Sequence, residues 1–224
     1  RESGYLCRGF LTTPKPKNAL RRIERFFQKQ PLKCSDAALV IVSLLKFTGK
    51  FDLCLDRTNW KFGRKNINYL VLSWRVNKQI SLPLLAVELD KAGNSNTQER
   101  LDLLQQFDDL FGFERIGSLL ADREFIGANW YKKLILWQVP FFIRIKDNGL
   151  LPYGDDVIHV KDLFKHLQGA QNRIVEKNMY GSTVYFAGTR SDKGDLVIVI
   201  TNQNWKPKKI LKQYRKRWSI EELF

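Results

Sequence analysis

The succession of strand-like and helix-like apolar patterns between residues 51 and 145 constrains the fold more than any other feature of the sequence. Stretches rich in β-forming side chains alternate there with stretches of helical periodicity. The predicted elements are, in order, strands over 51–56, 67–76 and 80–89, a helix over 97–112, a strand over 116–121, a helix over 130–137 and a strand over 140–145. Strands that alternate with helices in this way predict an α/β fold.

The chain outside this stretch divides into three further parts. Residues 1–50 read as a basic helical N-terminal segment, with a helix expected to start at Ser35. Residues 51–224 form the predicted main domain, which is interrupted by a β-rich insertion at about 147–201. Within the insertion, residues 184–188 and 196–201 predict a hairpin. A strongly basic helix is expected over residues 206–224.

Composition narrows the class of protein. The 224 residues are 44% hydrophobic, which suffices for one sizeable core. No apolar run reaches the roughly 18–20 residues that a membrane span needs. The three cysteines lie far apart, which argues against a disulfide framework or a zinc site and fits a reducing cytoplasm. His159 and His166 have no cysteine nearby, so surface or structural roles are favoured over zinc binding.

Net charge gives the first indication of function. Lys and Arg number 38 against 23 Asp and Glu, which leaves a formal charge of +15. Such a chain attracts polyanions, either nucleic acid or an acidic membrane surface. A basic protein without a specific polyanionic partner is the alternative explanation, and charge alone favours nucleic-acid binding.

Three acidic residues stand where catalytic carboxylates are found. Asp56 and Asp122 each end a predicted strand, and strand ends open onto clefts in α/β sheets. Either of them alone also fits a simple turn or helix cap. Glu221 lies in the last helix, on one face with Tyr214 and Arg217. An ordinary ion pair between Arg217 and Glu221 is the alternative there.

The basic neighbours of Glu221 favour phosphodiester chemistry over that alternative. Three converging carboxylates hold two divalent ions, which activate an attacking oxygen and stabilise a leaving one. Basic side chains then hold the flanking backbone phosphates. The cationic side chains near Glu221 are those of Lys206, Lys208, Lys209, Lys212, Arg215, Lys216 and Arg217.

Around these residues the sequence resembles the DDE transposases of bacterial insertion sequences, specifically the insertion-sequence-4 group. Residues 55–60 (LDRTNW) and 121–127 (ADREFIG) resemble the two aspartate blocks of that family. Tyr214, Arg217 and Glu221 follow its Tyr-x-x-Arg-x-x-x-Glu signature, and residues 94–100 resemble a stretch between the aspartate blocks. The resemblance covers about residues 50–224.

The resemblance implies an RNase H-like mixed sheet flanked by helices, with a β-rich insertion before the last catalytic helix. It also implies that Asp56 bridges two Mg²⁺ ions, or Mn²⁺ in their place, and that Asp122 and Glu221 each complete one ion site. Tyr214 and Arg217 would hold the backbone of the terminal DNA. The implied partners are double-stranded DNA, both transposon end and target, and a second copy in a synaptic homodimer. The implied location is the bacterial cytoplasm, at the nucleoid.

Further side chains are candidates for DNA contacts. Arg57, Lys61, Arg64 and Lys65 follow Asp56 in a predicted hairpin and are interpreted either as phosphate contacts or as a solvated turn. Lys212 and Lys216 belong to the same predicted helix as Glu221 and contribute to the positive charge around it. Trp205 is a candidate base-stacking platform, whereas core packing is favoured for Trp130. Glu124 is a lesser candidate metal ligand, and pairing with a basic side chain is favoured for it.

Two alternatives to a transposase remain at this point. One is an RNase H-like nuclease that only hydrolyses DNA. The other is a truncated, inactive DNA-binding remnant of a transposase. The chain begins with Arg1 and its only methionine is Met179, so we expect it to be a piece of a longer protein. The family signature continues with a Lys seven positions beyond the Glu, and the sequence ends at Phe224 before that position.

Overall fold

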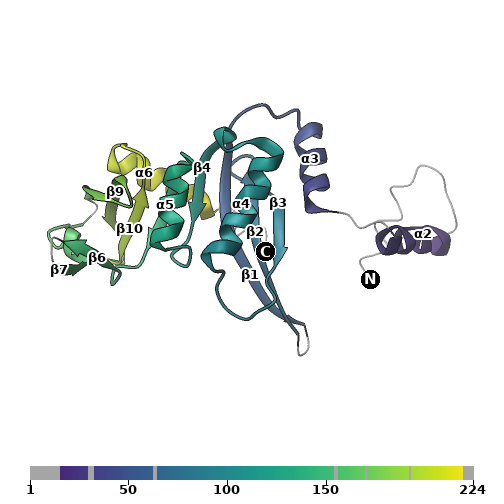
Figure 1. Ribbon diagram of the computed structural model, residues 1–224, viewed down its shortest axis with the longest axis horizontal. Helices are drawn as coiled ribbons and strands as arrows, with labels where there is room; N and C mark the ends of the chain where they lie inside the picture. The colour runs from purple at the N-terminus through teal and green to yellow at the C-terminus, as the bar shows by residue number, and fades with distance from the viewer. Residues whose placement is uncertain are drawn as a thin grey trace.

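The structure, a computed structural model, describes residues 16–29, 33–62, 65–153, 156–169, 171–191 and 193–218. Figure 1 shows the course of the chain. The helices are α2 (Pro16–Lys29), α3 (Cys34–Leu44), α4 (Thr97–Phe111), α5 (Ala128–Leu136) and α6 (Pro207–Arg215), with 3-10 turns η2 (Phe113–Arg115) and η3 (Val160–Phe164). The strands are β1 (Phe51–Phe62), β2 (Lys65–Arg75), β3 (Ser81–Glu88), β4 (Ile116–Ala121), β5 (Phe141–Ile145), β6 (Leu150–Tyr153), β7 (Asp156–His159), β8 (Asn172–Met179), β9 (Ser182–Arg190) and β10 (Leu196–Thr201).

One eight-stranded sheet, in the order β3-β2-β1-β4-β5-β10-β9-β8, organises these elements. The pairs β1–β2 and β2–β3 are antiparallel hairpins, whereas β4 is parallel to both β1 and β5. The predicted order of three strands, helix, strand, helix and strand is therefore confirmed, and the sheet is mixed. Two crossover helices, α4 and α5, connect the strands that run parallel.

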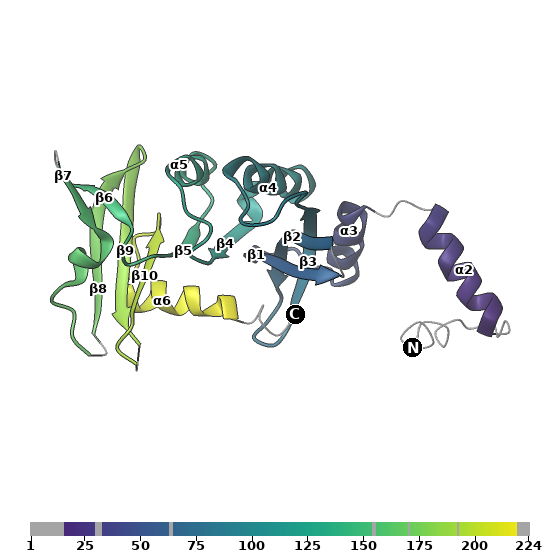
Figure 2. The same cartoon turned by 90° about the horizontal axis from the view of Figure 1, so that it is seen from below.

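Helices cover the two faces of the sheet unequally. Figure 2 shows α4 and α5 on one face and α6 on the other. The alternation of side chains along β1 follows this division, because Phe51, Leu53 and Leu55 belong to the larger core beneath α4 and α5. Cys54 points to the opposite face, into a smaller core that includes Ile210, Leu211 and Tyr214 of α6.

Local sequence signals set several element boundaries. The Asn96 side chain accepts a hydrogen bond from the Glu99 amide at 2.9 Å, and Glu99 accepts one from the Asn96 amide at 2.7 Å, so the two residues form a capping box at the start of α4. Gly112 ends that helix with a φ of 83°. The expected cap at Ser35 is wrong: α3 begins at Cys34 after Lys33, and no side chain caps it.

The predicted β-rich stretch joins the central sheet instead of standing beside it. β9 and β10 form the expected hairpin, with Leu196 opposite Arg190. β10 also pairs antiparallel with β5, from Ile198 opposite Ile145 to Thr201 opposite Phe142. The short β6–β7 hairpin forms a separate two-stranded sheet. Strands β8 to β10 are thus hydrogen-bonded continuations of the sheet that carries β1 and β4.

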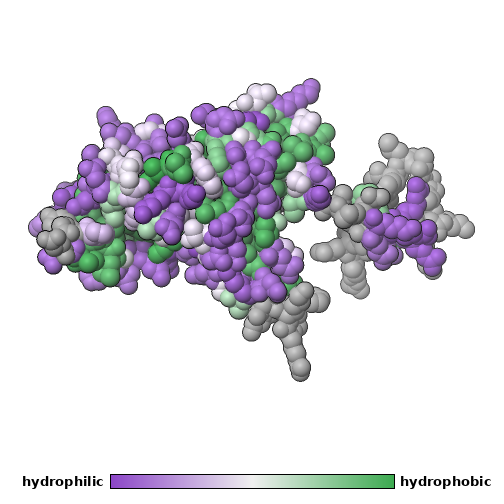
Figure 3. Space-filling view, viewed as in Figure 1, coloured by the Kyte–Doolittle hydropathy of each residue, from purple (hydrophilic) through white to green (hydrophobic). Residues whose placement is uncertain are grey.

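The N-terminal helices lie beyond the β3 edge. α3 contacts β3, and both views place α2 apart from the rest of the described chain. Apolar side chains gather on the exposed side of α3, namely Leu39, Val40 and Leu44 (Figure 3). No helix in the described ranges has the length and apolar character required to cross a bilayer.

Candidate functional site

Asp56 and Asp122 occupy neighbouring positions on adjacent parallel strands. The β1–β4 ladder ends at the pair Leu55 and Ala121. Asp56 is the next residue of β1, and Asp122 directly follows the end of β4. Parallel strands run about 4.8 Å apart, so both residues lie at the same edge of this ladder. The expectation that β1 ends at Asp56 is wrong, because the strand continues to Phe62 as the first arm of the β1–β2 hairpin. Asp56 is instead the residue at which β1 separates from β4.

Negative charge accumulates at this edge. The Asp56 side chain retains 24% of its accessible surface. Burial is the largest cause that raises the pKa of the Asp56 carboxyl, and the charges of Glu124 and Asp122 raise it further. The Arg57 amide, 2.9 Å from Asp56 Oδ1, and the Arg217 guanidinium oppose this increase without cancelling it. A cation at this edge would relieve the repulsion.

Arg57 connects the two aspartate segments. Its Nε lies 3.1 Å from Glu124 Oε1 and its Nη2 lies 3.3 Å from Glu124 Oε2, which is a bidentate ion pair. It also donates to Asn68 Oδ1 and to Asn94 Oδ1, both at 3.2 Å. Glu124 therefore pairs with a basic side chain, as favoured from the sequence. Arg57, which the sequence suggested for DNA contacts, is held by protein groups.

The loop that follows Asp122 has a second brace, which sequence reasoning missed. Arg100 of α4 is only 4% exposed. It donates from Nε to Ser95 Oγ at 2.9 Å, and its guanidinium reaches the carbonyl oxygens of Glu124 and Ile126, both at 3.2 Å. Arg100 closes the 94–100 stretch whose resemblance to the family was noted, and its buried position explains why an arginine stands there.

Tyr214 of α6 and Arg217, in the helical turn that follows α6, lie near this edge on the face of the sheet opposite α4 and α5. Arg217 is 7% exposed, and its Nη1 lies 3.8 Å from Asp56 Oδ2. Burial alone lowers the pKa of Arg217, but Tyr214, Asp122 and Asp56 together raise it above its ordinary value. The Tyr214 hydroxyl is buried beside the Arg217 guanidinium. Burial is the largest cause that raises the pKa of this hydroxyl, whereas the charge and hydrogen bond of Arg217 act to lower it.

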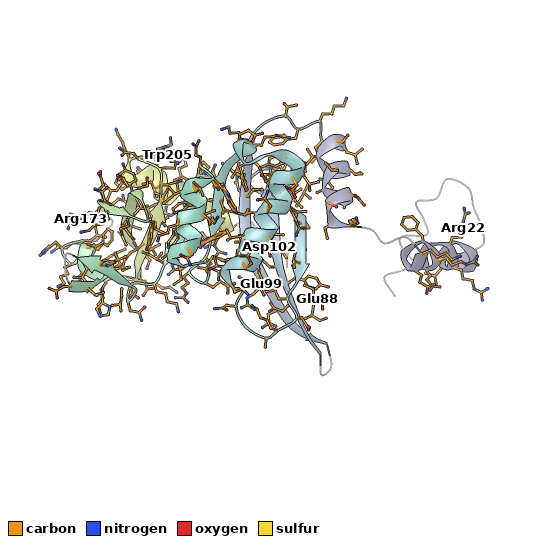
Figure 4. The ribbon with its side chains drawn as sticks, in the orientation of Figure 1. Arg22, Glu88, Glu99, Asp102, Arg173 and Trp205 are labelled. Carbon is orange, nitrogen blue, oxygen red and sulfur yellow. The ribbon has the colours of Figure 1, made fainter. Side chains whose placement is uncertain are left out.

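The remaining predicted site residues are distributed as follows. Lys212 is exposed on α6. Lys216 forms an ion pair with Asp52 at 2.8 Å, a residue that sequence reasoning did not select. Trp205 lies beside α6 (Figure 4), with its ring centroid 5.2 Å from that of Phe142 and 3.6 Å from Lys209 Nζ. Trp130 is fully buried, which confirms core packing.

Four predicted residues have no described side chain. Glu221 and Arg64 lie outside the described residues, and for Lys61 in β1 and Lys65 in β2 only the backbone is described. Within the described ranges, no group of three or more His, Cys, Asp or Glu side chains is arranged to hold a metal ion. Asp56 and Asp122 are thus the described part of the proposed carboxylate trio. Their hard oxygen donors and mutual repulsion suit a divalent cation such as Mg²⁺.

Comparison with known proteins agrees with this geometry. Residues 52–224 match the family model described as the transposase DDE domain. Among solved structures, the chain is similar to the piggyBac transposase in its synaptic complex with hairpin DNA, with a TM-score of 0.56 and 9% sequence identity. That match covers 98% of this chain and 51% of the piggyBac chain. No curated protein matches the sequence.

The structural similarity supports the fold expectation, a mixed sheet flanked by helices that corresponds to an RNase H-like transposase core. The family match spans both aspartate segments, the β-rich stretch and the basic C-terminal helix. The chain belongs to the transposase DDE domain family.

Proposed function

We propose that this chain is the catalytic part of a DNA transposase of the insertion-sequence-4 group, which cleaves DNA strands and joins the freed 3′ ends to a target. Asp56, Asp122 and Glu221 would hold two Mg²⁺ ions, for which Mn²⁺ can substitute. The observation that carries the proposal is the position of Asp56 and Asp122, each directly after the last paired residues of adjacent parallel strands. Family membership makes phosphoryl transfer the expected chemistry.

The ions, when bound, would supply activation of the attacking oxygen and stabilisation of the leaving oxygen. The protein groups prepare the site for them. Arg57 and Glu124 fix the distance between the first and second aspartate segments, and Arg100 fixes the loop after Asp122. Because these groups are held before substrate arrives, little reorganisation is needed during the reaction.

DNA would approach the site along the basic helix. Between residues 206 and 218 the chain has no acidic residue, and its exposed basic side chains are those of Lys206, Lys208, Lys209, Lys212 and Arg215. Arg217 and Tyr214 lie closest to Asp56 and Asp122 and would contact the backbone at the cleaved phosphodiester. Lys212 is exposed on α6, and Trp205 is half-exposed just before the helix begins. Both would contact the flanking DNA.

We further propose that two copies act together on two transposon ends. The piggyBac structure that this chain resembles is a synaptic complex with hairpin DNA. This chain spans about half the length of the piggyBac chain, so the remaining parts of that assembly have no counterpart among these residues.

The experiment uses a donor duplex with a pre-cut 3′ end, a supercoiled target plasmid and Mg²⁺ or Mn²⁺. The wild-type chain is compared with Asp56→Asn, Asp122→Asn and the matched surface variant Asp162→Asn, which removes a carboxylate on η3. Joined product from the wild type and Asp162→Asn, but not from the other two, would support the proposal. Nicked plasmid without any joined product would favour a purely hydrolytic nuclease. Retained DNA binding without cleavage would favour a DNA-binding remnant.

A further inference from the structure

A second carboxylate on β1, Asp52, is the centre of a polar cluster between the sheet and α6. Its Oδ1 accepts from Ser118 Oγ at 2.6 Å and from Gln213 Nε2 at 3.1 Å. Its Oδ2 accepts from Lys216 Nζ at 2.8 Å. Gln213 Nε2 also donates to Ser118 Oγ at 2.9 Å. Both carboxylate oxygens are therefore occupied, by groups from β4 and from the C-terminal helix.

The sheet alone positions two members of this cluster, Asp52 and Ser118. Asp52 and Ser118 are register partners in the β1–β4 ladder, directly after an irregularity between Phe51 and Asp52. Ser118 is completely buried, and Asp52 retains 25% of its side-chain surface. Hydrogen bonds in a partly buried setting are stronger than in bulk water. The acceptor is thus fixed by two strands, and the other two donors, Gln213 and Lys216, come from α6 and its C-cap.

The distribution of charge shows why the helix needs an anchor. Residues 206–218 carry seven Lys and Arg side chains and no Asp or Glu, so α6 has no internal counter-charge. Two consecutive residues of this segment reach β1: Lys216 contacts Asp52, and Arg217 lies 3.8 Å from Asp56 Oδ2. Asp52, Cys54 and Asp56 alternate onto one face of β1, which is the face that α6 covers.

We propose that Asp52, with Ser118, is the anchoring site of the C-terminal helix, and that Gln213 and Lys216 bind there so that Arg217 is held over Asp56. Asp52 is then a positioning residue, and Lys216 acts by holding the helix and not by contacting DNA. The consequence for catalysis rests on the proposed function. The two neighbouring ion pairs then have different roles. Asp56 and Arg217 belong to the reaction site, and Asp52 and Lys216 hold the helix in place.

The sign of the effect on DNA binding distinguishes an anchor from a phosphate contact. If Lys216 contacted a phosphate, Lys216→Gln would weaken DNA binding and reduce the salt dependence by about one ion. Asp52→Asn would then release Lys216 and strengthen binding. If Lys216 is an anchor, Lys216→Gln and Asp52→Asn each change the dissociation constant for DNA only by the small effect of one altered charge. Both variants then weaken the attachment of α6 to the sheet.

The test measures backbone amide hydrogen exchange by mass spectrometry on the 224-residue chain without metal or DNA. The variants are Asp52→Asn, Lys216→Gln and their combination. The control is the exposed ion pair of Asp162 and Lys165, 3.3 Å apart on and beside η3, changed to Asn and Gln. We expect exchange in residues 207–218 to accelerate about five- to tenfold in each single variant, with no further increase in the double variant, because one coupled interaction is lost. Exchange in α4 and in the control variants should stay at wild-type rates.

A second readout connects the anchor to the reaction. Plasmid nicking with Mn²⁺ should show a kcat about tenfold lower for Asp52→Asn, with the KM for DNA unchanged. Unchanged exchange in 207–218 would overturn the anchoring proposal, whatever the nicking result. Accelerated exchange in a chain whose wild type never nicks DNA would support the anchor and count against the proposed function alone.

Discussion

Asp52 and Asp56 lie four residues apart on one face of β1, and their carboxyl groups are shifted in opposite directions. Burial acts to raise the pKa of Asp52, but Lys216, Ser118 and Gln213 together lower it below its usual value. Burial, Glu124 and Asp122 raise the pKa of Asp56. One carboxylate is therefore stabilised by its neighbours, and the other carries an electrostatic penalty when it ionises, which a bound cation would relieve.

This difference predicts that Asp56→Asn stabilises the metal-free protein at neutral pH. A carboxyl group whose pKa is raised in the folded state destabilises that state once it ionises, so the penalty is complete above the folded pKa. It disappears as the pH falls to the unfolded value near 3.8. We expect urea unfolding at pH 7 to show a gain of about 0.5–1 kcal/mol, which shrinks as the pH approaches 4.

Asp52→Asn is the matched comparison on the same strand face and should have the opposite sign. A lowered pKa stabilises the folded state above the unfolded value, and that stability is lost as the pH falls through the folded pKa. At pH 7 we expect a loss of about 1 kcal/mol, which diminishes below pH 4. Equal signs for the two variants would contradict the assignment of different roles to the two carboxylates.

Divalent metal should stabilise the wild-type chain. Binding only to the folded state adds about 2.7 kcal/mol when the free ion is at 100 times its dissociation constant. We therefore expect the thermal midpoint to rise with increasing Mn²⁺ or Mg²⁺. Asp56→Asn and Asp122→Asn should lose this rise, and Asp162→Asn should keep it. A rise of the same size in all four proteins would indicate nonspecific ion binding.

Removing either partner of the Arg57–Glu124 ion pair should destabilise the fold, but by different amounts. Arg57→Ala leaves Glu124 without its bidentate partner beside Asp56, which should destabilise the fold by about 2 kcal/mol in urea unfolding. Glu124→Gln retains hydrogen-bonding capacity and reduces the local negative charge, so its cost should be smaller. Measured as a double-mutant cycle, the coupling should exceed that of the exposed pair Asp162 and Lys165.

Two buried tyrosines provide a paired test of the reaction site. Tyr214 lies beside Arg217, whereas Tyr131 of α5 packs in the core on the other face of the sheet. Tyr131→Phe should leave the unfolding free energy within about 0.5 kcal/mol, because no hydrogen bond is lost, whereas Tyr214→Phe should cost about 1 kcal/mol, because it removes the interaction with Arg217. Tyr214→Phe should lower kcat/KM for DNA nicking about tenfold, and Tyr131→Phe should not change it. Equal activity of the two variants would remove Tyr214 from the proposed DNA contacts.

Most of the sheet could be predicted from sequence because local periodicity and capping residues agree there. Asn96 and Glu99 specify the start of α4, and Pro83 is typical of an edge strand, which β3 is. The end of β1 was misjudged because the residues after Asp56 owe their strand conformation to pairing with β2, which alternation within one segment does not reveal. Long-range pairing also explains why the β10–β5 contact was not foreseen.

The site residues that follow strands could be predicted from the sequence. The contacts between the C-terminal helix and the face of the sheet could not. Asp56 and Asp122 could be selected because both follow apolar strand segments. Asp52 and Asp56 share a face by simple alternation, but only the position of α6 shows that Asp52 meets Gln213 and Lys216. The basic sequence neighbours of Arg57 predict a DNA contact, which stays a prediction, but they do not reveal its ion pair with Glu124, which is 67 residues away.

The hydrogen-bonded junction between β5 and β10 has a mechanical consequence. A region attached through loops alone can rotate on its tethers, but β8 to β10 are joined to the strand next to β4 by a ladder from Ile198 to Thr201. Their displacement relative to Asp122 would require shearing several backbone hydrogen bonds at once. The sheet therefore fixes the distance between the carboxylates and any ligand that binds to β8, β9 or β10.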